Sequence, residues 1–230
     1  MIGIICAMEI ELQKIRSSMQ NVKTEKISSV NFNIGKLYGK DCVVAVSGVG
    51  KVNAAACAQT MILKYNPEFI INVGVAGGLL EEMQVFDIVI SKNAVQSDVD
   101  TSALGDPKGF ISTIEVINLP CSEKLANLIL NKKQDDESTI HFGTIASSDK
   151  FIVDKTELQK IKKDFGAIAC DMETASIAQV CFLNSIEFLG VRIISDNINN
   201  ENSHLDYEKF KEVAANKGFK IIKNLLNEIK

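Results

Sequence analysis

The sequence predicts an α/β fold built as one domain, and three observations support this class. Apolar runs of strand length alternate along the chain with segments of helical periodicity, a pattern that is typical of α/β proteins. The chain has 230 residues and a hydrophobic content of 46%, which suits one domain with a sizeable core. No repeat, low-complexity segment or linker rich in proline and glycine divides it. We therefore expect a single domain over residues 1–230.

The expected strands are short and strongly apolar. Residues 2–6 are fully apolar, residues 69–73 are rich in β-branched side chains, and residues 188–194 form the longest apolar run. Two further runs form a strand pair across Gly39. The expected strands are residues 2–6, 32–37, 42–47, 69–73, 87–91, 140–146, 167–170 and 188–194.

The expected helices lie between these strands. Residues 52–65 are rich in alanine and stop before Pro67, and residues 207–229 place apolar side chains near helical spacing. The polar stretch 95–120 contains two glycines and two prolines, so we expect an extended loop region there. The expected helices are residues 9–19, 52–65, 123–131, 155–164, 172–183 and 207–229.

Composition and charge exclude several classes of protein. The net charge of -4 lacks the basic footprint of a nucleic-acid-binding protein. No run approaches the roughly 18 apolar residues of a membrane span, and the N-terminus lacks the basic leader of a signal peptide. The six cysteines form no CxxC pair and the two histidines have no ligand spacing, so we expect reduced thiols, no metal and a cytoplasmic location.

Glycines and charged residues gather directly after several expected strands. In open α/β sheets, ligands bind just beyond the carboxyl ends of the strands. Glycine at such a position lets the backbone approach a ligand, although a tight turn explains it equally well. Neither glycine cluster matches a Walker loop or a dinucleotide fingerprint. The polar strand ends are residues 7–11, 47–50, 74–78, 147–152, 171–173 and 192–196.

Three carboxylates at these strand ends are candidates for chemistry, and each also has a purely structural interpretation. Glu11 is either a solvated helix residue or a general base that activates water. Glu173 is either a carboxylate stabilised by a helix N-terminus, by about 0.3–1 kcal/mol, or a ligand of two adjacent ribose hydroxyls. Asp196 is either a loop residue or a general acid toward a purine nitrogen, which requires a pKa above its usual ~3.9. Arg192 lies in an apolar strand and needs a partner, for which Glu11 is a candidate.

Taken in order along the chain, these residues resemble the 5′-methylthioadenosine/S-adenosylhomocysteine nucleosidases, and the resemblance spans essentially the whole chain. It implies a three-layer α/β/α sandwich of nucleoside-phosphorylase type, with a mixed and partly closed central sheet, and a homodimer. The segments that carry it are Gly3-Ile4-Ile5-x-Ala7-Met8-Glu9-x-Glu11, Ser47-Gly48-Val49-Gly50-Lys51-Val52-Asn53-Ala54-Ala55, Ile71-Asn72-Val73-Gly74-x-Ala76-Gly77-Gly78, Ser148-x-x-Phe151-Ile152, Asp171-Met172-Glu173-x-Ala175-x-Ile177-Ala178 and Val191-Arg192-x-Ile194-Ser195-Asp196.

The resemblance also implies a role for each site residue. Glu11 matches the general base, Asp196 the acid that protonates adenine at N7, and Glu173 the ligand of the ribose hydroxyls. Phe151 matches the ring that stacks on adenine, and Ile152 the residue whose backbone contacts the edge of the base. The remaining implied contacts to substrate are Met8, Val49, Ala76, Gly77, Met172, Arg192, Ser195 and Tyr207.

The implied reaction is hydrolysis of the N-glycosidic bond of 5′-methylthioadenosine and S-adenosylhomocysteine, with 5′-deoxyadenosine as a further candidate substrate. One carboxyl group protonates the leaving base while another activates water, so no metal or organic cofactor is required. Val75 replaces a serine of many members, and Leu104 and Asp106 replace aromatic residues of the loop that commonly closes the partner's 5′ pocket. The preference between the methylthio and homocysteinyl groups is therefore left open.

Three alternatives remain at this point. A nucleoside phosphorylase would bind phosphate, but phosphate sites favour several arginines and this chain has only Arg16 and Arg192. A hydrolase of another purine nucleoside, such as futalosine, would have to recognise hypoxanthine, whereas Asp196 suits adenine better. A non-catalytic nucleoside-binding protein would not need Glu11, Glu173 and Asp196 together.

Overall fold

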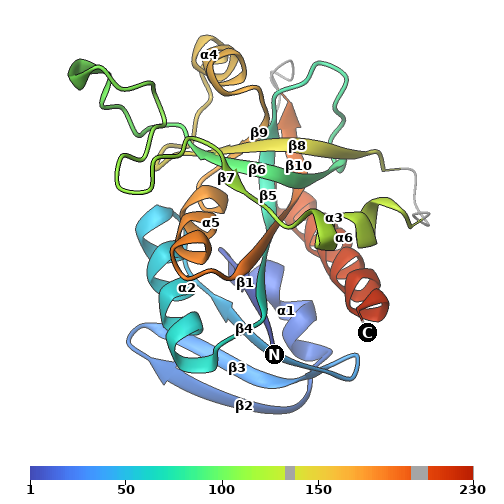
Figure 1. Ribbon diagram of the computed structural model, residues 1–230. Helices are drawn as coiled ribbons and strands as arrows, with labels where there is room; N and C mark the ends of the chain where they lie inside the picture. The colour runs from blue at the N-terminus through green and yellow to red at the C-terminus, as the bar shows by residue number, and fades with distance from the viewer. Residues whose placement is uncertain (133–137, 198–206, 230) are drawn as a thin grey trace.

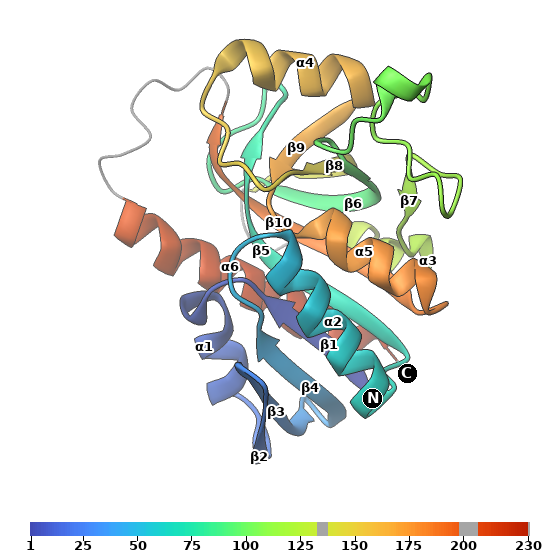
Figure 2. The same cartoon turned by 90° about the vertical axis from the view of Figure 1, so that its left-hand side faces the viewer.

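In the computed structural model, which describes residues 1–132, 138–197 and 207–229, helices cover both faces of a mixed β-sheet (Figures 1 and 2). The strands are β1 (Ile2–Cys6), β2 (Gln20–Ile27), β3 (Val30–Leu37), β4 (Lys40–Val46), β5 (Phe69–Gly78), β6 (Ile88–Gln96), β7 (Leu119–Pro120), β8 (Ile140–Ser147), β9 (Ala167–Asp171) and β10 (Glu187–Asn197). The helices are α1 (Glu9–Ser17), α2 (Lys51–Tyr65), α3 (Glu123–Leu130), α4 (Lys155–Phe165), α5 (Thr174–Leu183) and α6 (Tyr207–Glu228), with a 3₁₀ turn at Ser102–Leu104.

Five of these strands close into a ring. β5 pairs with β10, β10 with β6, β6 with β8, β8 with β9, and β9 returns to β5. From β5, the strands β1, β4, β3 and β2 continue as an open sheet. Parallel and antiparallel pairings both occur, so the mixed, partly closed sheet that the resemblance implied is confirmed.

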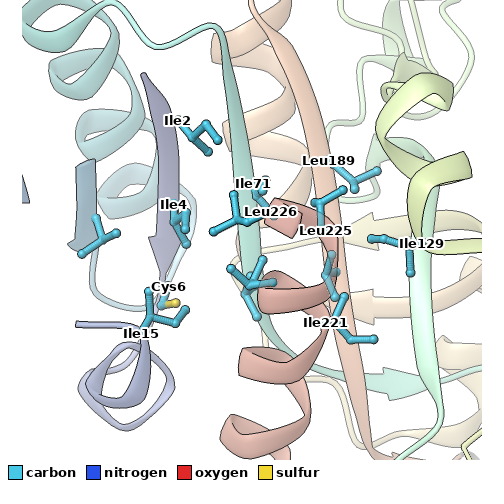
Figure 3. Packing of buried hydrophobic residues seen from close by; sticks show 14 of the residues in the cluster. Ile2, Ile4, Cys6, Ile15, Ile71, Ile129, Leu189, Ile221, Leu225 and Leu226 are labelled. Atoms are coloured by element: carbon cyan, nitrogen blue, oxygen red, sulfur yellow. The ribbon is translucent and has the colours of Figure 1, made fainter. Parts of the chain in front are cut away.

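The two largest hydrophobic clusters lie between the sheet and its helices, one on each face. On one face, Ile15 of α1, Ile129 of α3 and Leu225 of α6 pack with Ile4 and Ile71 of the sheet (Figure 3). On the other face, α2 and α5 pack against the alternate residues of the same strands, including Ile5 and Ile70. Successive residues of a strand point to opposite faces, so the fully apolar strands predict helices on both sides. The three-layer prediction is confirmed.

Some observed strands were not predicted from the sequence, and others extend beyond their predicted bounds. β2 was not expected, because most of its side chains are exposed and it lacks the apolar alternation of a half-buried strand. β5 runs on to Gly78 and β10 to Asn197, beyond their apolar cores. The stretch 95–120 was expected to be loop throughout, but it contains the 3₁₀ turn and β7. Within the described residues, no helix is both long and apolar enough to cross a membrane.

A branch point in the sheet lies along β5. β1 pairs with residues Phe69 to Val73, whereas β9 pairs with Gly77 and Gly78 further along. The residues between these pairings, Gly74 to Ala76, pair with β10. Ligands of α/β proteins bind where neighbouring strands diverge in this way, so the topology points to Gly74–Gly77 as the centre of the site.

Candidate active site

Glu11 lies in the first turn of α1, immediately after β1. Its Oε2 accepts hydrogen bonds from the backbone N–H groups of Ala7 at 3.0 Å and Met8 at 2.9 Å. The residue is buried, with 5% of its surface exposed. Burial raises the pKa of Glu11 to about 7, although the N–H of Met8 and the positive charge of Arg192 oppose this, and the charge of Glu173 adds to it. A carboxyl group with this pKa can both bind and release a proton near neutral pH.

Gly74 explains why Glu11 can lie against β5. A β-carbon at this position would lie 3.2 Å from Oε1 of Glu11 and 3.5 Å from Nη1 of Arg192. Glycine therefore leaves the space that these two side chains occupy at the branch point. Here the close backbone approach predicted from the sequence is made to side chains of the protein itself.

Glu173 connects the N-termini of α5 and α2. It is the N-cap residue of α5, and its Oε1 accepts a hydrogen bond of 2.9 Å from the N–H of Gly50, the N-cap residue of α2. Gly50 adopts a φ of 97°, a left-handed conformation that favours glycine. Burial raises the pKa of Glu173, and the nearby charge of Asp171 raises it further. Because the charge of Glu173 also raises the pKa of Glu11, the two carboxylates lie within electrostatic reach of each other.

Arg192 is fully buried and pairs with Asp171, not with Glu11 as the sequence suggested. Its Nε donates to Oδ2 of Asp171 at 2.7 Å, and both side chains are only 1% exposed. Its Nη1 donates to the backbone carbonyl of Asn72 at 3.1 Å, and its Nη2 to the side-chain oxygen of the same residue. Glu11 takes backbone N–H donors instead, because the turn from β1 into α1 presents them directly.

Asp171 is a site residue to which the sequence analysis gave no role. Its two oxygens accept from the hydroxyls of Ser147 and Thr174, and from the N–H groups of Glu173 at 3.3 Å and Thr174 at 3.2 Å. It therefore fixes Arg192 and the backbone of Glu173 at the same time. The sequence pattern that could have pointed to Asp171 is its position, directly after the expected strand 167–170 and two residues before Glu173.

Replacing Asp171 with asparagine is expected to destabilise the fold by about 3 kcal/mol, because removing one partner leaves the charge of Arg192 buried and unpaired. The measurement is the free energy of unfolding in urea. Asp41→Asn is the matched control, since its pair with Lys36 lies on an exposed hairpin. Equal losses of stability in the two variants would contradict the account.

Asp196 belongs to β10 and lies beside Gly77, three residues beyond Gly74 on β5. A bulge after Ile194 brings Asp196 opposite Gly77, and a β-carbon on Gly77 would lie 3.5 Å from its Oδ2. Its Oδ1 accepts a hydrogen bond from the hydroxyl of Ser195. Glu11 adjoins Gly74 and Asp196 adjoins Gly77, three residues apart, which corresponds to roughly 10 Å along a strand. Glu11 and Asp196 thus both adjoin this short stretch of β5, whereas Glu173 is held at the N-terminus of α2 by its bond to Gly50.

The other predicted contacts to substrate differ in their exposure. Ala76 is buried, whereas Val49 is 49% exposed and Phe151 is 67% exposed. The half-buried members of the set are Met8, Gly77, Ile152, Met172 and Ser195. Tyr207 is the first residue of α6, and its side chain lies outside the described part of the chain.

Comparisons with known proteins identify the family of this chain. Residues 1–227 match the family model of the phosphorylase superfamily. The 5′-methylthioadenosine/S-adenosylhomocysteine nucleosidase of Staphylococcus aureus is 35% identical over 233 residues, which covers all of both chains. A mutant of the Helicobacter pylori nucleosidase with 5′-methylthioadenosine in its active site aligns with a TM-score of 0.92 and 30% identity, covering 99% of this chain and 98% of that one.

A second enzyme name appears among the similar structures. The native futalosine hydrolase of Helicobacter pylori also aligns with a TM-score of 0.92 and 30% identity, covering 99% of this chain and 97% of that one. The resemblance drawn from the sequence motifs is nevertheless confirmed by the superfamily model and by the full-length relatives. The chain therefore belongs to the phosphorylase superfamily and, within it, to the 5′-methylthioadenosine/S-adenosylhomocysteine nucleosidases.

Proposed function

We propose that this chain hydrolyses the N-glycosidic bond of 5′-methylthioadenosine and S-adenosylhomocysteine, releasing adenine and the 5′-thio-substituted ribose. The observation that carries the proposal is that Glu11 and Asp196 both adjoin Gly74–Gly77 of β5, with Glu173 close enough for its charge to act on Glu11. Such a reaction needs one carboxyl group for the water and another for the leaving base, with the sugar held between them. One domain of residues 1–230 would carry all of these groups.

Glu11 is the proposed general base. Its Oε2 already accepts two backbone N–H groups, which leaves Oε1, beside Gly74, to take a proton from the attacking water. A base is most effective when its pKa lies near the working pH, and burial brings the pKa of Glu11 to about 7. Arg192, held by Asp171 and Asn72, would favour the ionised form of Glu11 by its charge.

Asp196 is the proposed general acid, which gives a proton to N7 of the leaving adenine. The hydroxyl of Ser195 donates to Oδ1, so Oδ2 beside Gly77 is the oxygen proposed to carry the proton. Phe151 would stack on the base, while Ile152 would present its backbone to the base edge. Protonation of the leaving group matters because negative charge develops on adenine as the bond breaks.

Glu173 is the proposed ligand of the ribose 2′- and 3′-hydroxyls. One of its oxygens accepts from the N–H of Gly50, and the carboxylate is proposed to accept from the sugar hydroxyls as well. Met172 would pack on the ribose, and Tyr207 would lie beside the 5′ group. Fixing the sugar lowers the entropic cost of the attack by water. Met8, Val49, Ala76 and Gly77 would complete the wall of the pocket.

Phosphorolysis is not favoured by the arrangement of the arginines. Arg192 is already bound to Asp171 and Asn72, and Arg16 forms an exposed pair with Glu9 at 2.6 Å. A phosphate site would need cationic side chains near Gly74 with free donors. Futalosine hydrolysis is a second candidate, because a futalosine hydrolase aligns with this chain as closely as the nucleosidase does.

Substrate identity is tested by incubating the purified protein with 5′-methylthioadenosine, S-adenosylhomocysteine, 5′-deoxyadenosine and futalosine in separate reactions. We expect adenine from the adenosine compounds, and the ratio of their kcat/KM values gives the preference for the 5′ group. Turnover of futalosine alone would replace the proposed substrates with the second candidate. Failure to release a base from any of them would reject the hydrolase proposal.

We also propose that the protein is a cytoplasmic homodimer. Each of the six cysteines is free and five are buried, as suits a reducing compartment. Val52 and Leu63 of α2 are 77% and 76% exposed, and Leu183 of the adjacent α5 is 58% exposed. Large apolar side chains gathered on neighbouring helices favour a protein interface.

Replacing Leu63 with glutamate is expected to convert the dimer into a monomer, because the introduced carboxylate would be buried without a partner in the proposed apolar interface. The measurement is the molar mass by light scattering, together with adenine release. Glu68→Gln, an exposed substitution near the end of α2, is the control. A monomeric wild-type protein would contradict the proposed assembly.

A further inference from the structure

Three segments outside the proposed catalytic residues are held together by one polar network. Nζ of Lys51, at the start of α2, donates to Oδ1 of Asp98 at 2.5 Å. Oδ2 of Asp98 accepts the N–H of Asp149 at 2.9 Å, and Oδ1 of Asp149 accepts the N–H of Lys51 at 2.7 Å. Each residue therefore contacts the other two, and we name this closed set the Lys51–Asp98–Asp149 triangle.

The triangle joins the ends of three elements. Asp98 follows β6 by two residues and Asp149 follows β8 by two residues, and these strands are neighbours in the sheet. Lys51 is the first residue of α2, and the preceding N–H, that of Gly50, binds Glu173. Two successive N–H groups at the N-terminus of α2 therefore bind different partners. That of Gly50 donates to Glu173, the residue proposed to bind the ribose hydroxyls, and that of Lys51 donates to Asp149 of the triangle.

The segment after β8 depends on such polar anchors. It carries Phe151 and Val153, which are 67% and 69% exposed, and its apolar packing is confined to Ile152, which contacts the cluster containing Leu158 of α4. Its far end is fixed where Asp154 caps α4 by accepting the N–H of Glu157 at 2.8 Å. Its near end is fixed by Asp149 in the triangle. Two polar anchors, together with the packing of Ile152, therefore hold residues 150–153 in place.

We infer that Lys51, Asp98 and Asp149 are positioning residues that hold Phe151 and Ile152, the proposed base-binding residues, in register with Glu173. The inference rests on the proposed function, in which Phe151 and Ile152 contact adenine. Because those contacts are made equally in the bound substrate and in the transition state, loosening the segment should raise KM and leave kcat unchanged. The dissociation constant of adenine should rise together with KM.

The test compares variants of the whole protein in adenine binding and in turnover of 5′-methylthioadenosine. Lys51→Met keeps the backbone N–H and the aliphatic stem but removes the charge, and we expect KM to rise about three- to fivefold. Asp149→Ala removes an anionic acceptor of a backbone N–H, and we expect a rise of about tenfold. Asp149→Asn, which keeps an acceptor oxygen, should lie between wild type and Asp149→Ala.

The chain offers a matched control on the same segment. Lys150 pairs with Glu157 of α4 at 2.5 Å, so Lys150→Met removes an adjacent positive charge without touching the triangle. It should leave KM and adenine binding unchanged. Lys51→Arg keeps the charge and should have near wild-type KM and adenine binding. The double variant that combines Lys51→Met with Asp98→Asn should be no worse than Lys51→Met alone, because each substitution removes the same ion pair between Lys51 and Asp98.

The outcomes separate this inference from the proposed function. Wild-type protein that releases adenine, with KM and adenine binding in Lys51→Met and Asp149→Ala within about twofold of wild type, would overturn the inference alone. A Lys150→Met variant as impaired as Lys51→Met would also overturn it, because the effect would then be general to the charge of the segment. Wild-type protein that releases no adenine would remove the proposed function and the inference with it.

Discussion

Replacing Glu11 with glutamine is expected to abolish adenine release and, at pH 8, to make the folded protein more stable. Loss of a general base lowers kcat by roughly 10²–10⁴-fold. The gain in stability follows from the pKa of Glu11, which burial raises from its ordinary 4.5 to about 7. Glutamine can still accept the N–H groups of Ala7 and Met8 through its amide oxygen, so the local structure of the turn is kept.

The sign of the stability effect depends on pH. A carboxyl group whose pKa is higher in the folded state binds more protons there, so stability decreases as the pH rises from about 4.5 to about 7. Above pH 7 the folded protein bears the full cost of the buried charge of Glu11, up to about 3 kcal/mol by the relation between pKa and free energy. Glu11→Gln removes that cost at pH 8 and changes little at pH 4.

Urea denaturation at the two pH values, combined with adenine release, measures both effects. Glu9→Gln is the matched control, because Glu9 is exposed on the same helix and pairs only with Arg16 at the surface. In the wild type, kcat/KM should decrease as the pH falls through about 7, where Glu11 takes up a proton. A Glu11→Gln variant that is less stable than wild type at pH 8, or that retains turnover, would contradict the role of Glu11.

Asp196→Asn is expected to bind 5′-methylthioadenosine intact and to turn it over roughly 10²–10⁴-fold more slowly than wild type, because asparagine cannot transfer a proton to N7. Its amide oxygen can still accept the hydroxyl of Ser195, so the end of β10 should keep its conformation. Calorimetric titration with 5′-methylthioadenosine gives the affinity, and adenine release gives the rate.

Asp100→Asn is the control for this variant, since Asp100 is exposed and its hydrogen bonds come from Ser102 of the same loop. It should behave as wild type in both measurements. Near-normal turnover by Asp196→Asn would remove Asp196 from the mechanism. Loss of substrate binding by Asp196→Asn would instead show that it contributes to affinity more than to proton transfer.

Strands and helices whose cores are apolar could be predicted from the sequence, because hydrophobic periodicity reports burial directly. β1 is buried along its whole length and matches its prediction residue for residue. β2 could not be predicted in this way, because an edge strand with exposed side chains has no apolar period. The last residues of β5 are glycine-rich, which resembles a turn in sequence, although they pair with both β9 and β10.

The positions of the candidate site residues along the chain could be predicted from the sequence better than the side chains with which they pair. The strand-end signal singled out Glu11, Glu173 and Asp196; in the structure Glu11 adjoins Gly74 and Asp196 adjoins Gly77, and the convergence of all three on one substrate stays a prediction. Arg192 was correctly expected to need a partner, but the choice of Asp171 depends on β9 and β10 both pairing with β5 in the closed ring, and no local pattern encodes that.

The Lys51–Asp98–Asp149 triangle likewise could not be predicted from the sequence. Its three residues come from separate segments, and only the tertiary fold makes them neighbours. Sequence periodicity reports which residues are buried, whereas contacts between distant strand ends arise from the order in which the strands pair.

The most direct test of the central claim is to incubate purified protein with 5′-methylthioadenosine, with and without added phosphate, and to identify both products. The account predicts that adenine is released at the same rate in both conditions, with free methylthioribose as the second product. Release that requires phosphate and yields methylthioribose 1-phosphate would contradict hydrolysis, and the role of Glu11 as the base that activates water would have to be withdrawn.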